Sequence, residues 1–208
     1  MSSNKSRPTK NRSALEPQRS HGKLRVAALM EAGATVIAKR GFQAATMAEI
    51  ASEAGAPIGS LYRFFPNKEI LADALIQRFR EVIAEAFEEI NSRIESLSTA
   101  ALAEALLNIM PDLHGEKLAI RALLEAHSDW SVKRSEFRTG MRQNIARTLM
   151  LRCPRLNPKT AKDMAAILLQ NMKMVGVLHA ELRGEAGLGA LAELRKMTLL
   201  YLEDKLGN

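Results

Sequence analysis

The sequence lacks the features that mark secreted and membrane proteins. Among its 208 residues there is one cysteine, Cys153, which excludes an intramolecular disulfide and fits a reducing compartment. No apolar segment follows Met1, so we expect no secretory signal. The most apolar run, 164–180, contains Lys173, and a lysine at the centre of a membrane span costs about 2.5–3.5 kcal/mol. We therefore expect a cytoplasmic protein with no membrane-spanning segment.

Motifs for catalysis and for metal binding are also missing. None of the four histidines follows a glutamate by three positions, which removes the Glu-x-x-His pattern of di-iron helical bundles. There is no His-Glu-x-x-His sequence, no phosphate-binding loop and no nucleophile elbow. The sequence thus predicts a protein that is not an enzyme, with no catalytic residue, no bound metal and no cofactor. The alternative is a helical enzyme or carrier. Turnover of a substrate by the purified protein would support that alternative.

Acidic residues are scarce at the start of the chain, where positive charge collects. The net charge is +7, and residues 1–25 contain seven Lys or Arg against Glu16 alone, which accounts for six of those seven charges. The remainder is nearly neutral. A basic arm on a neutral body favours a polyanionic partner, although a solvated, disordered tail gives the same composition. We expect residues 1–18 to form a disordered basic arm.

The composition and the helix breakers predict a helical protein. Ala, Leu and Met are favoured over Val and Thr, and no strand-like alternation occurs. We expect an all-α fold of about nine helices, with a three-helix helix-turn-helix head over 19–66 and a helical body over 67–208. Asn67 and the Asn157-Pro158 pair are expected to cap the helices that follow them. The expected helices lie at about 19–40, 46–54, 57–65, 67–96, 99–110, 116–152, 157–182 and 190–205, with 183–189 as a loop.

The stretch 46–68 predicts the helix-turn-helix. Thr46-x-x-Glu49 is a capping box ahead of apolar residues at helical spacing, and Gly55 supplies a left-handed turn at the helix end. Pro57 suits the first turn of the next helix, whose amino-terminal residues would enter the major groove of DNA. The alternative is an ordinary helical hairpin with Tyr62 at its rim. The candidate DNA contacts are Arg19, Lys23, Thr46, Ile58, Gly59, Ser60, Tyr62, Arg63 and Lys68.

The letters TMAEIASEAGAPIGSLYRFFPNKEIL resemble the amino-terminal signature of the tetracycline-repressor (TetR) family, and the likeness covers about residues 23–71. The resemblance implies a homodimeric DNA-binding repressor with an effector pocket. It implies that Thr46, Tyr62 and Lys68 contact phosphates, and that Gly59 and Ser60 lie on the recognition helix.

Three positions depart from the family pattern. Pro57 and Ile58 stand where the family often has Ser and Lys, and Ile58 would meet a thymine methyl group instead. Phe64 replaces the frequent His or Tyr, which removes a phosphate donor. The operator sequence is therefore not predictable from this chain.

The last long helices are too apolar for a single buried face. The segments 164–180 and 188–202 are apolar nearly all round, which suits helices that pack on the body on one side and on a second subunit on the other. The alternative is a central helix in a monomeric bundle. A two-fold dimer would place its recognition helices about 34–36 Å apart, one turn of DNA. The candidate interface residues are Leu168, Met172, Val175, Leu191, Leu194 and Tyr201.

The body is also expected to hold a small apolar or amphipathic effector. Such pockets lie between helices and are mostly apolar, with a few polar groups. The alternative for each candidate is plain core packing. The candidates are Met110, His127, Trp130, Phe137 and Met141.

Two regulator hypotheses follow. The first is a dimeric repressor that binds a double-stranded operator and releases it when the effector binds, with the helix that starts at Lys68 as the lever. The second is an effector-independent architectural or cell-cycle factor that binds DNA with the same head. Neither involves a membrane.

Overall fold

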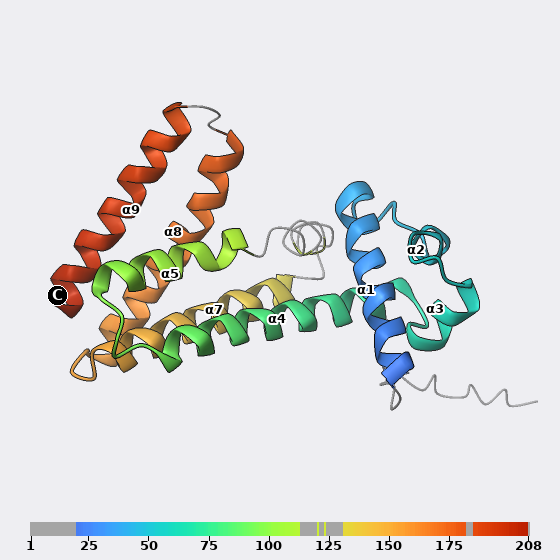
Figure 1. Ribbon diagram of the computed structural model, residues 1–208, viewed down its shortest axis with the longest axis horizontal. Coiled ribbons are helices and arrows are strands. Elements are labelled where there is room, and N and C mark those ends of the chain that lie inside the picture. The colour runs from blue at the N-terminus through green and yellow to red at the C-terminus, as the bar shows by residue number, and fades with distance from the viewer. Residues whose placement is uncertain (1–19, 113–119, 121–122, 124–130, 182–184, 208) are drawn as a thin grey trace, which may run out of the picture. The chain divides into compact units, whose positions relative to one another are not determined.

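The computed structural model describes residues 20–112, 120, 123, 131–181 and 185–207, and its regular secondary structure in these ranges is entirely α-helical (Figure 1). This confirms the predicted all-α fold. The predicted basic arm, residues 1–18, lies outside the described residues. The helices are α1 (Ser20–Arg40), α2 (Met47–Glu53), α3 (Ile58–Phe64), α4 (Lys68–Ser92), α5 (Thr99–Asp112), α7 (Ser131–Arg152), α8 (Pro158–Glu181) and α9 (Glu185–Leu206).

Several helix ends follow the local chemistry that the sequence predicts. The Asn67 side chain accepts a hydrogen bond of 2.8 Å from the backbone N–H of Ile70, and Asn157 accepts one of 2.8 Å from Lys159. Both side chains therefore act as caps, as expected. After α1, Gly41 has φ +76°, a left-handed conformation that favours glycine.

The start of α9 differs from the expectation. Residues 185–189 were predicted to be loop, but the helix begins at Glu185. Gly187 is buried inside this first turn. A glycine inside a helix lowers helix stability by about 1 kcal/mol relative to alanine, which is why the local sequence favours a loop here.

The chain divides into two compact units, Met1–Gln77 and Arg78–Asn208, which we call the amino-terminal and the carboxy-terminal unit. The division falls within α4 and not at the predicted 66/67 boundary. The reason is that α4 residues Leu71, Ala72 and Leu75 are buried in the amino-terminal unit. A side chain at Gly33 of α1 would place its Cβ 2.9 Å from a Leu71 methyl, so α1 and the start of α4 approach closely there and a larger residue would require the Leu71 side chain to shift.

The amino-terminal unit has a core of large side chains. α2 packs on α1 and on α3. The large members of this core that are at most 1 % exposed are Leu29, Ile37, Phe42, Ile50, Leu61, Phe65 and Leu71.

In the carboxy-terminal unit α8 is the central helix, because it packs on α5, α7 and α9 (Figure 1). Its inner face holds Met164, Leu168, Met172 and Val175, all with no exposed surface. The spacing of these residues by three and four positions marks one helical stripe. In the described ranges, no helix combines the length and apolar character needed to cross a bilayer.

Candidate nucleic-acid interface and ligand pocket

The amino terminus of α2 is fixed by the predicted capping box. The Thr46 hydroxyl accepts a hydrogen bond from the backbone N–H of Glu49 (3.2 Å), and the Glu49 carboxylate accepts one from the backbone N–H of Thr46 (3.0 Å). The Thr46 hydroxyl also donates to this carboxylate (2.9 Å). These bonds, the side-chain bond first, lower the pKa of Glu49, and Arg40 adds to the effect. Thr46 itself is exposed.

The turn between α2 and α3 depends on Gly55. This residue has φ +56°, and its N–H donates to the carbonyl of Ser52 (3.0 Å). The N–H of Ala56 donates to the carbonyl of Ala51 (2.9 Å). The two bonds form the Schellman motif, which ends a helix and turns the chain sharply. Pro57 then caps α3 in an extended conformation, one position before the helix rather than in its first turn.

The two faces of α3 differ in exposure. Leu61 and the following Phe65 are 0 % and 1 % exposed and anchor the helix in the core, whereas Ile58 and Tyr62 are 46 % and 48 % exposed. Arg63 is exposed and Ser60 is half-buried. Apolar and aromatic side chains held outward beside an arginine suit contact with a macromolecule.

Gly59 is exposed on the same helix. A Cβ added at Gly59 meets no atom within 4 Å, so nothing in the described part of the chain requires a glycine there. A glycine inside a helix lowers its stability by about 0.5–1 kcal/mol relative to alanine. A glycine on this exposed face leaves room for the close approach of a partner.

Lys68 makes structural contacts that the sequence does not predict. Its ammonium donates hydrogen bonds to the carbonyls of Gln43 (3.0 Å) and Ala45 (2.8 Å), and lies 4.7 Å from the centre of the Phe42 ring. Two of the three donors of the ammonium thus hold the segment that leads into Thr46. One donor is left for a phosphate.

The remaining predicted DNA contacts are Lys23 and Arg19. Lys23 is exposed near the start of α1, and Arg19 lies outside the described residues.

Two exposed ion pairs join α1 to α2, Lys39–Glu53 at 3.6 Å and Arg40–Glu49 at 3.7 Å. Such exposed pairs contribute about 0–1 kcal/mol each, so they add little to the stability of the unit.

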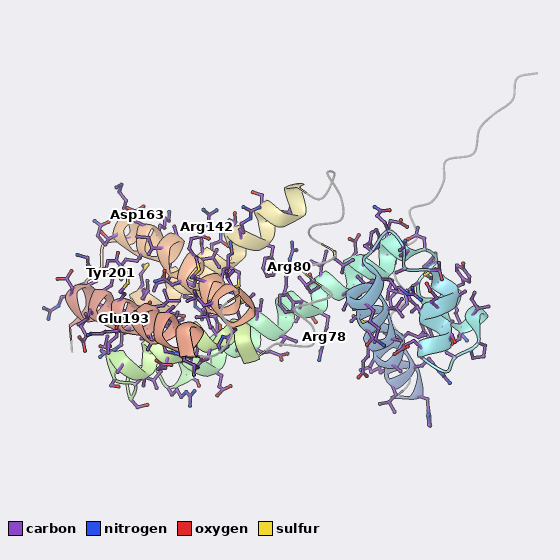
Figure 2. All side chains as sticks on the ribbon, turned by 90° about the horizontal axis from the view of Figure 1, so that it is seen from above. Arg78, Arg80, Arg142, Asp163, Glu193 and Tyr201 are labelled. Atoms are coloured by element: carbon purple, nitrogen blue, oxygen red, sulfur yellow. The ribbon has the colours of Figure 1, made fainter. Side chains whose placement is uncertain are left out.

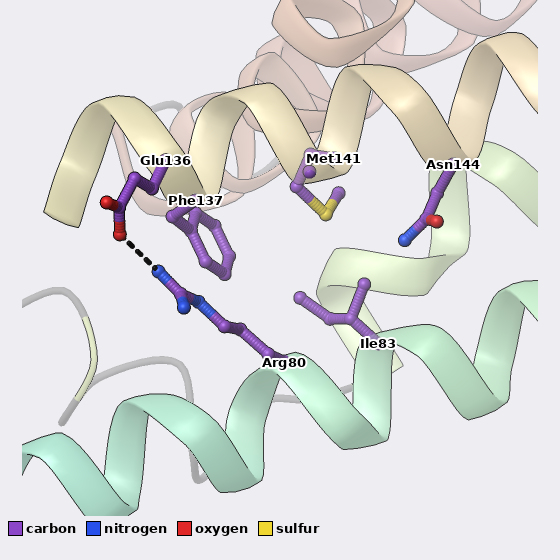
Figure 3. Close-up of a pocket in the computed structure, with 7 residues that line it drawn as sticks. Arg80, Ile83, Glu136, Phe137, Met141 and Asn144 are labelled. Atoms are coloured by element: carbon purple, nitrogen blue, oxygen red, sulfur yellow. Dashed lines mark hydrogen bonds and ion pairs between the residues drawn. The ribbon is translucent and has the colours of Figure 1, made fainter.

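In the carboxy-terminal unit a pocket of about 340 Å³ lies between α4 and α7 (Figure 3). Phe137 and Met141 belong to its wall, together with residues that sequence reasoning missed: Arg80, Ile83, Glu136, Gly140 and Asn144. Met110 is half-buried on α5 and does not line this pocket. His127 and Trp130 lie outside the described residues.

Arg80 and Glu136 form an ion pair of 3.4 Å at one end of this pocket (Figure 3). Behind the wall, the ring of Phe137 stacks on Phe79 with centroids 5.7 Å apart. Phe79 is 2 % exposed, so Phe137 is backed by the core. In the described residues no group of three or more His, Cys, Asp or Glu is placed to hold a metal ion.

Four of the six predicted interface residues of α8 and α9 face inward. Leu168, Met172 and Val175 have no exposed surface and Leu191 is 5 % exposed, while Leu194 and Tyr201 are half-buried. The four buried side chains therefore offer almost no surface to a second subunit, whereas Leu194 and Tyr201 stay candidates.

The outward faces of α8 and α9 are also apolar. Apart from Leu188 (65 %) in the first turn of α9, the large exposed apolar side chains on them are Ile167 (50 %), Met174 (43 %), Val177 (37 %), Met197 (65 %) and Leu200 (55 %). Asp163 and Glu193, labelled in Figure 2, precede Ile167 and Met197 by one helical turn and therefore lie on the same faces. We call these seven residues the outer strip.

Residues 29–75, which form most of the amino-terminal unit, match the sequence model of the family described as bacterial regulatory proteins, tetR family. Over these residues the chain is similar to the amino-terminal domain of the tetR family. The matched span includes the helix-turn-helix, in which α3 is the second helix.

Curated relatives match part of this chain. The HTH-type transcriptional repressor KstR2 of Rhodococcus jostii is 35 % identical over 79 residues, which are 38 % of each chain. The fatty acid metabolism regulator protein of Bacillus subtilis is 33 % identical over 79 residues, 38 % of this chain and 39 % of that one. The nucleoid occlusion factor SlmA of Haemophilus ducreyi is 25 % identical over 120 residues, 55 % of this chain and 58 % of that one. The chain thus spans less than two fifths of the length of the first two.

Solved structures share the fold over nearly the whole chain. A TetR-family transcriptional regulator from Mesorhizobium loti has a TM-score of 0.69 at 18 % identity, covering 90 % of this chain and 98 % of that one. The transcriptional regulator FadR from Bacillus subtilis, solved in complex with stearoyl-CoA, has a TM-score of 0.61 at 17 % identity and covers 88 % and 98 %. At this identity the similarity shows the fold alone.

Proposed function

We propose that the protein is a dimeric, DNA-binding transcriptional regulator of the cytoplasm, a repressor that a small-molecule effector releases from its operator. The observation that carries this proposal is the outward face of α3. It holds Ile58, Tyr62 and Arg63 in the open while Leu61 fixes the helix from behind. A helix presented in this way at the end of a tight turn suits the major groove.

In the proposed complex the side chains divide by role. Ile58 meets the methyl group of a thymine, and Gly59 and Ser60 let the backbone approach base edges. Phosphates are bound by Thr46, Tyr62, Arg63 and Lys68, and by Lys23 and Arg19 from the start of the chain. The Thr46 hydroxyl would share its hydrogen bonds between Glu49 and a phosphate oxygen.

The proposed dimer forms through the outer strip. Five exposed apolar side chains on two neighbouring helices leave a surface that a second copy would cover. A two-fold axis through this surface makes the contacts of both copies identical. This arrangement supports a palindromic operator with half-sites about 34–36 Å apart.

Effector release is proposed to act through α4. This helix contributes residues to both units, and Arg80 and Ile83 in its middle line the pocket. A ligand that binds better to the conformation unable to hold DNA shifts the equilibrium, typically by about 1–3 kcal/mol. The stearoyl-CoA bound to the Bacillus subtilis FadR structure supports a ligand-responsive regulator.

The test is fluorescence anisotropy with labelled DNA from upstream of the protein's own gene. We expect tighter binding to this DNA than to a scrambled duplex, and an affinity that falls steeply as salt rises. Arg63→Gln should reduce the slope of log affinity against log salt concentration by about one, as expected for the loss of one phosphate contact. Arg93→Gln, which removes an exposed arginine of the carboxy-terminal unit, is the matched control. Equal binding to both duplexes would reject the proposal.

A second candidate function is an effector-independent architectural or cell-cycle factor. The partial match to a nucleoid occlusion factor favours it. Sequencing of genomic DNA that co-purifies with the protein separates the two candidates. A few sites near promoters support the repressor, whereas many dispersed sites support the second candidate.

A further inference from the structure

We propose that the effector is a small amphiphile with one negatively charged head group, such as a carboxylate. This group displaces Glu136 from its ion pair with Arg80. The inference rests on the proposed effector function and assigns its ligand chemistry. It follows from the residues that line the pocket, the weakness of the Arg80–Glu136 ion pair and the positive charge of α7.

The pocket separates apolar and polar groups along its length. Ile83, Phe137 and Met141 form the apolar part, the Arg80–Glu136 pair lies at one end and Asn144 lies toward the other (Figure 3). A ligand that fills this pocket needs an apolar body and a polar group at the Arg80 end. The planar guanidinium of Arg80 can hold a carboxylate through two hydrogen bonds.

The ion pair that now occupies Arg80 is weak. Its atoms are 3.4 Å apart, and the Arg80 and Glu136 side chains are 36 % and 59 % exposed. Exposed pairs of this kind contribute little to stability because water screens them. An incoming carboxylate in the partly apolar pocket can therefore replace Glu136, which turns to solvent.

The charge of α7 favours an anion over a cation. This helix carries six Lys or Arg, and Glu136 is its one acidic residue. Burial, followed by repulsion from Arg138 and Arg142, lowers the pKa of Lys173 on the neighbouring α8. Arg138 and Arg142 therefore lie close to Lys173 and add to the positive charge of α7, although neither lines the pocket. The acids of α4 nearest in sequence to Arg80, Glu81 and Glu85, do not line the pocket.

The volume sets the size of the ligand. At about 30 Å³ for each water-sized group, a pocket of about 340 Å³ accommodates roughly eleven non-hydrogen atoms. A straight-chain acid of eight carbons has this size. Octanoate is therefore the probe, and 1-octanol and octylammonium are matched probes without charge and with the opposite charge.

The experiment is isothermal titration of the full-length protein with the three probes. We expect octanoate to bind at least about tenfold more tightly than 1-octanol or octylammonium. Arg80→Gln should weaken octanoate binding about tenfold, and Arg80→Lys should weaken it less. Glu136→Gln should strengthen it about threefold, because the competitor for Arg80 is gone. Opposite effects from the two halves of one ion pair are the signature of the proposal.

A second ion pair between the same helices supplies the control. Arg147 of α7 pairs with Glu88 of α4, and neither residue lines the pocket. Arg147→Gln and Glu88→Gln should leave octanoate affinity unchanged, and thermal unfolding by circular dichroism should show that all variants fold. Equal binding of the three probes, no binding of octanoate, or changes of the same sign for Arg80→Gln and Glu136→Gln would overturn the inference.

DNA binding, measured in parallel, separates this inference from the proposed function. If octanoate does not bind while operator binding persists, the ligand chemistry is refuted and the DNA-binding function stands. If octanoate binds with the expected pattern but no specific DNA is bound, the pocket assignment stands and the regulator proposal fails.

Discussion

The amino-terminal unit and the carboxy-terminal unit encode their structures in different ways. In the former, short helices are joined by residues with special backbone roles, such as Thr46 at a cap and Gly55 in a left-handed turn. In the latter, long helices meet through side chains, and the structure depends on which face of α8 turns inward. Local chemistry fixes the first unit, and packing fixes the second.

The largest expected effect tests the packing of α8 with two adjacent residues. Leu168→Asp places a carboxylate where no surface is exposed and should lower the free energy of unfolding by about 4 kcal/mol or more. Ile167→Asp, at a position 50 % exposed, should leave the helical circular dichroism intact and convert dimer to monomer in sedimentation velocity. Similar behaviour of the two variants would mean that α8 has no distinct inner and outer face.

The next effect tests the backbone roles in the helix-turn-helix with two glycines. Gly55→Ala should lower the free energy of unfolding by about 1–2 kcal/mol, because alanine is strained at φ +56°. Gly59→Ala should raise it by about 0.5–1 kcal/mol, since its Cβ meets nothing within 4 Å.

The Gly59 variant should nevertheless bind operator DNA more weakly, because the added methyl group lies on the outward face of α3. Chemical denaturation and anisotropy on the same samples measure both effects. Unchanged DNA affinity in a stabilised Gly59→Ala protein would contradict the close approach proposed for this position.

A smaller effect separates the two roles of Lys68. Lys68→Met removes hydrogen bonds to the carbonyls of Gln43 and Ala45 and should lower the free energy of unfolding by about 1 kcal/mol. It should also weaken DNA binding and reduce the salt slope. Arg63→Met, at an exposed position, should change DNA binding with little change in stability. If Lys68→Met leaves the free energy of unfolding unchanged, the hydrogen bonds to Gln43 and Ala45 do not stabilise the unit, and the proposed phosphate contact would be the only role of Lys68.

The smallest effect is a pH dependence at the α2 cap. The hydrogen bonds from Thr46 lower the pKa of Glu49 in the folded state. The stability that they provide is present above the pKa of the unfolded chain, about 4.3, and is lost as pH falls through the lower folded value. Between about pH 5 and pH 3 the wild type should lose slightly more stability than Glu49→Gln. Parallel melting curves for the two proteins would contradict this role of the carboxylate.

The units also differ in how far the sequence predicts them. Three features of the amino-terminal unit depend on residues close together in the chain: the capping box at Thr46, the end of α1 at Gly41 and the turn at Gly55. Hydrophobic periodicity and turn chemistry therefore predict them. The clamp by Lys68 depends on carbonyls 23 and 25 positions earlier, so no local pattern indicates it.

In the carboxy-terminal unit the helices are predictable but their orientation is not. Ile167 and Leu168 are both large and apolar, so hydrophobic periodicity gives no preference for which one faces inward. The pocket shows the same limit. The apolar side chains of Phe137 and Met141 mark them as pocket candidates from sequence, whereas Arg80 and Ile83 line the pocket because α4 lies against α7 there. That pairing is a tertiary property.

The inner and outer faces of α8 use different side chains, and this has an evolutionary consequence. In the proposed dimer, substitutions at Ile167, Met174 or Val177 would alter the surface offered to another copy without disturbing the residues that fold one chain. A duplicated gene can thus acquire its own pairing preference in a few steps, and two diverging regulators in one cell can stop forming mixed assemblies while each still folds.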